Sequence, residues 1–221
     1  MKIPQKKLQR FNREMKKGRA FYPQESKYEW LKDLLDAYQI ADAGTRIELE
    51  SLIKRTNRKI VCDKGCFACC LNPTIPINQI ELMGLSWYVS EIMDDETYER
   101  IAQQLITHSE TTACHFLLDG ACSVYPVRPL ACRVFHVFDN PCENYEDVSK
   151  TRPEDIAHGH KVEIAWMVTQ KLMPHMGVQN KADQLELFGE GFMMKNTRAM
   201  HTFDWKDFKK QVDYIKKTID K

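Results

Sequence analysis

Residues 62–70 read CDKGCFACC, and this stretch decides how the rest of the sequence is interpreted. It holds four cysteines in nine positions, and the last two are adjacent. The other four cysteines of the chain follow singly, at Cys114, Cys122, Cys132 and Cys142. Eight thiols in this order can form disulfides, act in redox chemistry or hold a metal, so the surrounding sequence has to distinguish between these uses.

The first twenty residues, MKIPQKKLQRFNREMKKGRA, indicate whether the protein is expected to be secreted. They are basic and no apolar run follows them, so they do not have the pattern of a secretory signal. No stretch approaches the ~18 consecutive apolar residues of a transmembrane helix, so no membrane association is expected. We therefore expect a cytoplasmic protein, in which thiols stay reduced and structural disulfides are rare.

The spacing of the cysteines favours a metal site. Gaps of two and three residues let a short turn point neighbouring thiolates at one ion, and all-cysteine sets select zinc or iron–sulfur clusters over hard cations. Adjacent side chains diverge, so Cys69 and Cys70 are expected to serve different metals or the two walls of one cluster. Redox-active thiols at Cys66 and Cys69 are an alternative, although no thioredoxin-like βαβ pattern surrounds them. For Cys142 alone, a small buried apolar role is a further alternative.

Apolar residues repeat at intervals of three and four in several stretches, which predicts amphipathic helices. Asn78, with Glu81 three residues later, has the pattern of a helix N-cap. The glycines and prolines near the cysteines predict turns instead, including one at Asp119-Gly120. The helices are expected over residues 24–58 with a break at Gly44, and over 77–93, 94–108, 153–174, 181–194 and 205–219. The predicted fold class is mainly α, with helices packed around an irregular, turn-rich cysteine metal-binding core.

Charge divides the chain into three predicted segments. Residues 1–58 form a basic arm and a helical N-terminal extension, 59–145 the cysteine-cluster domain, and 146–221 a helical C-terminal extension that packs on the core. The net charge is +7 over residues 1–20, +4 over 195–221 and −10 between them. A basic arm can dock an acidic protein partner or RNA. Solvated chain ends explain the same pattern, and a nucleic acid partner is not expected.

The cysteine pattern resembles a known family. CDKGCFACC, then CHFLLDGACSVYPVRPLACRVF, then a last cysteine in DNPCENY is similar to the YkgJ-like cysteine-cluster proteins, described as zinc- or iron-chelating domains. The resemblance covers about residues 60–145. It implies a zinc ion (Zn²⁺) or an iron–sulfur cluster, with a 4Fe–4S cluster among the candidates. The implied ligands are all eight cysteines, namely Cys62, Cys66, Cys69, Cys70, Cys114, Cys122, Cys132 and Cys142.

The block around Cys132 belongs to the same resemblance. It has the form aromatic-x-x-Arg-Pro-x-x-Cys-Arg, with Tyr125, Arg128 and Arg133 beside the cysteine. We expect these three residues to contact the ligand cysteines without binding the metal, or to bind a substrate anion. The two arginines can donate to sulfur or to a buried carboxylate. Hydrogen bonds from the two arginines to local carbonyl groups are the alternative.

Three functions follow from the sequence. The first is a cytoplasmic metal-binding protein organised by an iron–sulfur cluster or zinc. The second is a protein lysine methyltransferase that depends on the cluster, because some larger relatives of the family are flagellin lysine methylases, which use S-adenosylmethionine. The third is a zinc-stabilised interaction module with a basic arm. The sequence contains no catalytic triad, zinc-protease motif or phosphate-binding loop that would name a reaction.

Overall fold

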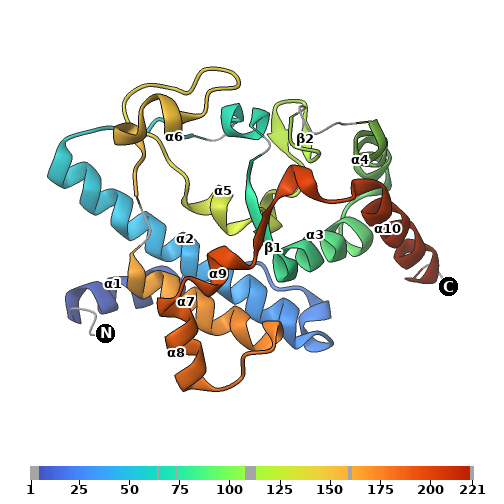
Figure 1. Ribbon diagram of the computed structural model, residues 1–221, viewed down its shortest axis with the longest axis horizontal. Helices are drawn as coiled ribbons and strands as arrows, with labels where there is room; N and C mark the ends of the chain where they lie inside the picture. The colour runs from blue at the N-terminus through green and yellow to red at the C-terminus, as the bar shows by residue number, and fades with distance from the viewer. Residues whose placement is uncertain (1–4, 64, 73, 108–112, 159–160, 220–221) are drawn as a thin grey trace.

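The computed structural model describes residues 5–63, 65–72, 74–107, 113–158 and 161–219 (Figure 1). The fold is mainly α, as the sequence predicted, and its strands are short. Two small antiparallel sheets pair β1 (Pro76–Asn78) with β4 (Thr197–Ala199) and β2 (Leu117–Leu118) with β3 (Ala121–Cys122). The α-helices are α1 (Gln5–Met15), α2 (Glu29–Thr56), α3 (Gln79–Glu91), α4 (Asp95–Thr107), α5 (Leu130–Val134), α6 (Val148–Thr151), α7 (Val162–Leu172), α8 (Lys181–Gly189), α9 (Phe192–Lys195) and α10 (Trp205–Ile219). The 3₁₀ turns are η1 (Pro23–Ser26), η2 (Ala68–Leu71), η3 (Tyr125–Val127), η4 (Pro153–Asp155), η5 (Met173–Met176) and η6 (Met200–Thr202).

The long helix α2 is the centre of the packing, and it contacts α1, α3, α5 and α7. The sequence predicted that Gly44 would end a first helix, and this is wrong because α2 continues through it. A Cβ atom at Gly44 would lie 2.6 Å from Cγ2 of Ile164, so the glycine is there to let α7 approach. A single glycine inside a helix costs only about 1 kcal/mol relative to alanine, which the close packing offsets.

Helix α3 begins with the predicted cap. The Asn78 side chain accepts a hydrogen bond from the Glu81 backbone N–H at 3.0 Å, and Glu81 accepts one from the Asn78 N–H at 3.1 Å. This capping box satisfies two N–H groups that the helix cannot pair internally. Asn78 also ends β1, whose pairing with β4 brings the C-terminal segment back to α3. Helix α10, predicted over 205–219, packs on α3 and α4.

Part of the predicted basic arm is folded. Within the described residues of the segment 1–20, α1 lies against α2, and Phe11 is buried in the main core. Phe11 and Met15 lie four residues apart and therefore share one face of the helix. Arg10 and Glu14 pair with side chains of α2, at Glu50 and Arg46. The segment is thus an amphipathic helix whose charges are partly neutralised, and an exposed arm is not what these residues form.

Two helices predicted near the C-terminus are interrupted. Residues 153–174 begin with η4, after which Ile156 forms an antiparallel bridge with Val137, so α7 starts only at Val162. Positions 159–160 of this predicted helix lie outside the described residues. Residues 181–194 divide into α8 and α9 at Gly191, whose φ of +77° is left-handed and ends the helix.

The cysteine segments lie on one side of the helical body. In Figure 1, β2 and α6 are at the top of the view, whereas α1, α7 and α8 are at the bottom, and α5 lies between them. The main core draws on residues from Phe11 to Val212 and so on all three segments that the sequence distinguished. Across the described ranges, none of the helices has both the length and the apolar character of a membrane span.

Candidate metal centre

The first cysteine segment is a series of tight turns. The Cys66 N–H donates to the Asp63 carbonyl at 3.0 Å, and Gly65 between them has a left-handed φ of +91°. The next turn is η2, in which the Cys70 N–H donates to the Phe67 carbonyl at 2.8 Å. Glycine takes the left-handed conformation without the steric cost that a Cβ atom brings. The backbone of this segment is therefore irregular and turn-rich, as the sequence predicted.

A second segment docks on the first through its backbone. The Cys114 N–H donates to the Cys70 carbonyl at 2.7 Å. Cys122 lies at the end of the β2–β3 hairpin, whose turn at Asp119 and Gly120 has left-handed φ angles of 50° and 74° and was predicted. A Cβ atom at Gly120 would lie 3.3 Å from the Phe67 ring, so the hairpin turn packs against the residue that follows Cys66.

The last two cysteines, Cys132 and Cys142, lie on later segments, and Cys62 contacts the chain between them. Cys132 lies on α5. The sulfur of Cys62 accepts a hydrogen bond from the Val137 N–H at 3.3 Å, next to a backbone bond from the Val61 N–H to the Val137 carbonyl. A cavity of about 260 Å³ is lined by Cys69, Cys132 and Cys142 together. Residues more than sixty positions apart in the sequence therefore meet at one site.

Burial keeps most of these thiols neutral. Removal from water raises the pKa of Cys62 to about 11 and that of Cys114 to about 12. The same desolvation raises the pKa of Cys122, Cys132 and Cys142. Thiolate charge at Cys66 and Cys69 raises the pKa of Cys62 and Cys142 further, which means that these sulfurs lie within electrostatic range of one another. Such a set loses its protons readily only when a cation replaces them.

Cys69 and Cys70 behave as a pair. The thiol of Cys70 donates a hydrogen bond to the sulfur of Cys69, which lowers the pKa of Cys69 and raises that of Cys70. Cys70 also lies within electrostatic range of Cys114 and Cys122. Cys69 has an effect on the pKa of thiols from every segment, including Cys132 and Cys142.

The sulfurs lie in one region but are not arranged as the coordination shell of a metal ion. Among the residues that the structure describes, no three Cys, His, Asp or Glu side chains are arranged closely enough to hold a metal ion. Zinc–sulfur bonds are about 2.3 Å long, and neutral thiols have no reason to converge to that extent without the ion. The donor set itself, soft sulfur from eight cysteines, fits zinc or iron and not magnesium or calcium.

Arg133 makes its contacts with carbonyls and a carboxylate. Its side chain is 3% exposed and donates to Asp42 Oδ2 at 2.8 Å, to the Arg128 carbonyl at 2.9 Å and to the Pro126 carbonyl. Its guanidinium carbon also lies 4.0 Å above the Tyr38 ring. Burial lowers the pKa of Arg133. The two carbonyls are the local partners that the sequence left open as the alternative, whereas the Asp42 carboxylate is 91 residues away in the sequence.

Arg128 and Tyr125 lie nearer the surface. The guanidinium of Arg128 stacks on the Tyr125 ring at 3.9 Å, and its Nη1 donates to the Tyr125 carbonyl at 3.1 Å. Tyr125 is 59% exposed. The charge of Arg128 lowers the pKa of Cys122, in opposition to the larger effect of burial. Arg128 therefore acts on the thiols through its field, while its direct contacts are with Tyr125 and Asp42.

Glu81 has a role that the capping pattern did not reveal. Its Oε1 accepts a hydrogen bond from the Leu130 N–H at 2.6 Å, at the first residue of α5. Burial raises the pKa of Glu81 to about 7, against the effect of two N–H donors and Arg133. One carboxyl group thus joins the start of α3 to the start of the helix that carries Cys132. The capping pattern at Asn78 indicated only the first half of this arrangement.

A second cavity adjoins the thiol cavity. It has a volume of about 580 Å³, and its walls include the buried side chains of Glu81 and Thr169 in a mostly apolar lining. Pro76, Ala131 and Phe135 line both cavities. Pockets of roughly 300–1,000 Å³ hold small organic molecules, so an organic ligand in this cavity would lie next to the thiols.

The arginines that hold the Cys62 and Cys142 segments were missed by the sequence analysis. They are Arg58 and Arg152, whose partners include Asp139, Glu146 and Asp155. Arg58 and Asp155 are separated by 97 residues. No local pattern marks ion pairs of this separation, so no signal in the sequence could have identified them.

Residues 61–167 match the family model named CxxCxxCC, whose description reads "Putative zinc- or iron-chelating domain". The matched range includes all eight cysteines and ends inside α7. No curated protein and no solved structure matches the chain.

Proposed function

We propose that the cysteine thiolates of residues 61–167, the range that matches the CxxCxxCC model, hold zinc or an iron–sulfur cluster in the cytoplasm. The observation that supports this most is the meeting of thiols from separate chain segments at one half-buried site. Apolar packing does not require that many cysteines in one place. Cytoplasmic thiols have no strong drive to pair as disulfides.

The proposed ligands are the eight cysteines named above. We call Cys69, Cys70, Cys114, Cys122 and Cys132 the inner set, and Cys62, Cys66 and Cys142 the outer set. Zinc bound by four thiolates would stabilise the turns around it, whereas an iron–sulfur cluster would add electron transfer or an open iron. Arg128 stabilises the ionised form of Cys122 through its charge. The turn at Gly65 and the contact of Phe67 with Gly120 orient the first segment toward the second.

Metal and sulfide content together with an absorption spectrum, on protein purified without oxygen, test this proposal. Iron, sulfide and a broad band near ~400 nm identify a thiolate-bound cluster, and one or two zinc ions in a colourless protein identify a structural site. Cys66→Ser and Cys69→Ser are expected to lower metal content and melting temperature. Met83→Ala, which removes an exposed sulfur from α3, is the matched control and is expected to change neither. Cysteine variants with full metal content and an unchanged melting temperature would contradict the proposal.

A methyltransferase is the second candidate, and one observation favours it. The 580 Å³ cavity beside the thiols is large enough for a methyl donor or an organic substrate. Titration calorimetry of the metal-loaded protein with S-adenosylmethionine tests this alternative. Saturable heat that is lost when Ala165→Trp fills the cavity would support it, and an absence of heat in the loaded wild type would reject it.

A further inference from the structure

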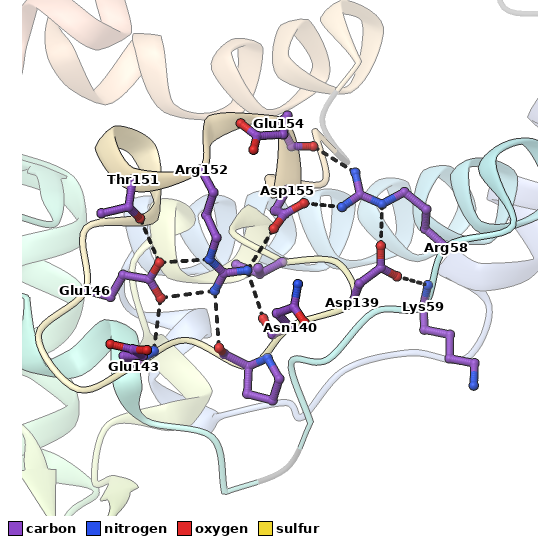
Figure 2. A network of polar contacts seen from close by, with 12 residues as sticks. Arg58, Lys59, Asp139, Asn140, Glu143, Glu146, Thr151, Arg152, Glu154 and Asp155 are labelled. Atoms are coloured by element: carbon purple, nitrogen blue, oxygen red, sulfur yellow. Dashed lines mark hydrogen bonds and ion pairs between the residues drawn. The ribbon is translucent and has the colours of Figure 1, made fainter.

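The side chain of Arg152 forms hydrogen bonds across the loop of residues 139–147, which carries Cys142. Figure 2 shows these contacts. The Nε and Nη2 of Arg152 donate to the two oxygens of Glu146 at 2.8 Å and 3.0 Å, and its Nη1 donates to Asp155 Oδ2 at 2.9 Å. The same guanidinium donates to the carbonyls of Asn140 and Pro141 at 3.0 Å and 3.2 Å. These five contacts match the five N–H donors of an arginine side chain.

Arg58 holds the other end of the same segment. Its Nε donates to Asp139 Oδ2 at 2.6 Å, its Nη2 donates to Asp155, and its Nη1 donates to the Glu154 carbonyl at 2.8 Å. The Lys59 N–H donates to the second oxygen of Asp139 at 2.9 Å. Asp155 is therefore shared by two arginines, one on each side, as Figure 2 shows.

The hydrogen bonds of Arg58 and Arg152 lie next to two of the proposed ligand cysteines in the sequence. Pro141, whose carbonyl Arg152 binds, directly precedes Cys142, and Arg58 lies four residues before Cys62. The network thus links the backbone beside one outer thiol to the backbone beside another. The side chains of Arg152 and Glu146 are 17% and 11% exposed, so this bidentate pair is partly shielded from solvent.

The loop has little else to hold it. Residues 139–147 contain no helix or strand, and Tyr145 is 68% exposed. Asp139 and Tyr145 have left-handed φ angles of 61° and 65°, which non-glycine residues adopt at a steric cost. Hydrogen bonds to Asp139 and Glu146 maintain this conformation on both sides of Cys142.

We propose that Arg152 is a positioning residue of the metal centre, which together with Arg58 fixes the outer thiols Cys142 and Cys62 so that they reach the same site as the inner thiols. The inference rests on the proposed function, because it assigns these arginines to that same site. The positioning role predicts that loss of Arg152 affects some of the proposed ligands and not others. Loss of Arg152 weakens the outer ligands and leaves the inner ones, such as Cys114 and Cys122, in place.

The test is the rate at which iodoacetamide alkylates each cysteine of the metal-loaded protein, measured by mass spectrometry together with metal content. In Arg152→Gln, Cys142 and Cys62 are expected to react at least about tenfold faster than in the wild type, as for lost hydrogen bonds to a charged group. Cys114 and Cys122 are expected to stay protected. Arg152→Lys is expected to behave like Arg152→Gln, because a lysine cannot span Glu146, Asp155 and the carbonyls together. Lys150→Gln removes an exposed charge from the same region and is the matched control.

Three results would overturn the positioning role. One is unchanged protection of Cys142 in a loaded Arg152→Gln protein, and another is full rescue by Arg152→Lys, which would show that only charge matters. The third is equal exposure of all eight cysteines in both Arg152→Gln and the milder Glu146→Gln, which would indicate general unfolding. A wild type that holds no metal would overturn the proposed function itself, and the positioning role with it.

Discussion

The helical body and the cysteine segments of this protein are stabilised by different interactions. In the body, α2 buries Leu31, Leu34 and Ala37 completely, and close contacts at Gly44 and Gly84 bring neighbouring helices together. In the cysteine region, Phe116, Val124 and Val127 join the main core. The segments beside Cys62 and Cys142 are held instead by a small apolar cluster that includes Phe138 and Ala157, and by turns and ion pairs. We therefore expect the body to be stable without a metal, and the segments beside Cys62 and Cys142 to depend on their polar partners and on the proposed metal.

Leu34→Ala is expected to give the largest change in global stability. Leu34 packs directly against the position of Gly84 in α3, where a Cβ atom would lie 2.4 Å from its Cδ2. Its truncation leaves a cavity and is expected to lower the free energy of unfolding by about 2–5 kcal/mol. Denaturant unfolding followed by circular dichroism measures this. Ile53→Ala, on the exposed face of the same helix, is the control and is expected to cost much less.

The metal content of the folded Leu34→Ala protein sharpens the comparison. If the body and the cysteine region are stabilised separately, the variant should bind as much metal as the wild type. A Leu34→Ala protein that remains folded but has lost its metal would show that the two regions are one cooperative unit.

Glu146→Gln is expected to give a smaller change that depends on pH. Hydrogen bonds from Arg152 lower the pKa of Glu146 to about 2, well below its ordinary value in an unfolded chain. The carboxylate therefore stabilises the fold fully above about pH 4.5, and this contribution is lost as the pH falls toward 2. The melting temperatures of wild type and Glu146→Gln should differ at pH 7 and converge in acid. A difference that stays constant between pH 7 and pH 3 would show that the charge of Glu146 is irrelevant. Because metal release in acid affects both proteins, the comparison between them isolates Glu146.

The helical body could be predicted from the sequence to a large extent. The periodic spacing of apolar residues identified α10 with its correct bounds, and the pattern at Asn78 and Glu81 identified the N-cap of α3. The error at Gly44 has a physical reason, because a glycine in a sequence marks either a helix end or a close approach of two helices, and only the position of Ile164 decides which. The helix α1 was missed because its many charged residues obscure the apolar face that carries the buried Phe11.

The cysteine region could be predicted in its local turns and not in its arrangement. The soft, clustered thiols of CDKGCFACC and the turn at Asp119-Gly120 are local features, so the sequence contains them. The docking of Cys114 on the Cys70 carbonyl is a backbone contact between distant segments. The pair of Arg58 and Asp139 spans 81 residues. Contacts of this kind depend on how the helices fold together, which local patterns do not specify.

Hydrogen exchange of the protein before and after metal removal tests the central claim most directly. The claim is that metal organises the cysteine segments and that the helical body is stable without it. Chelation is therefore predicted to accelerate exchange over residues 65–71 and 113–142 while the amides of α2 and α7 keep their protection. Unchanged exchange in the cysteine segments after complete removal of the metal would contradict the claim.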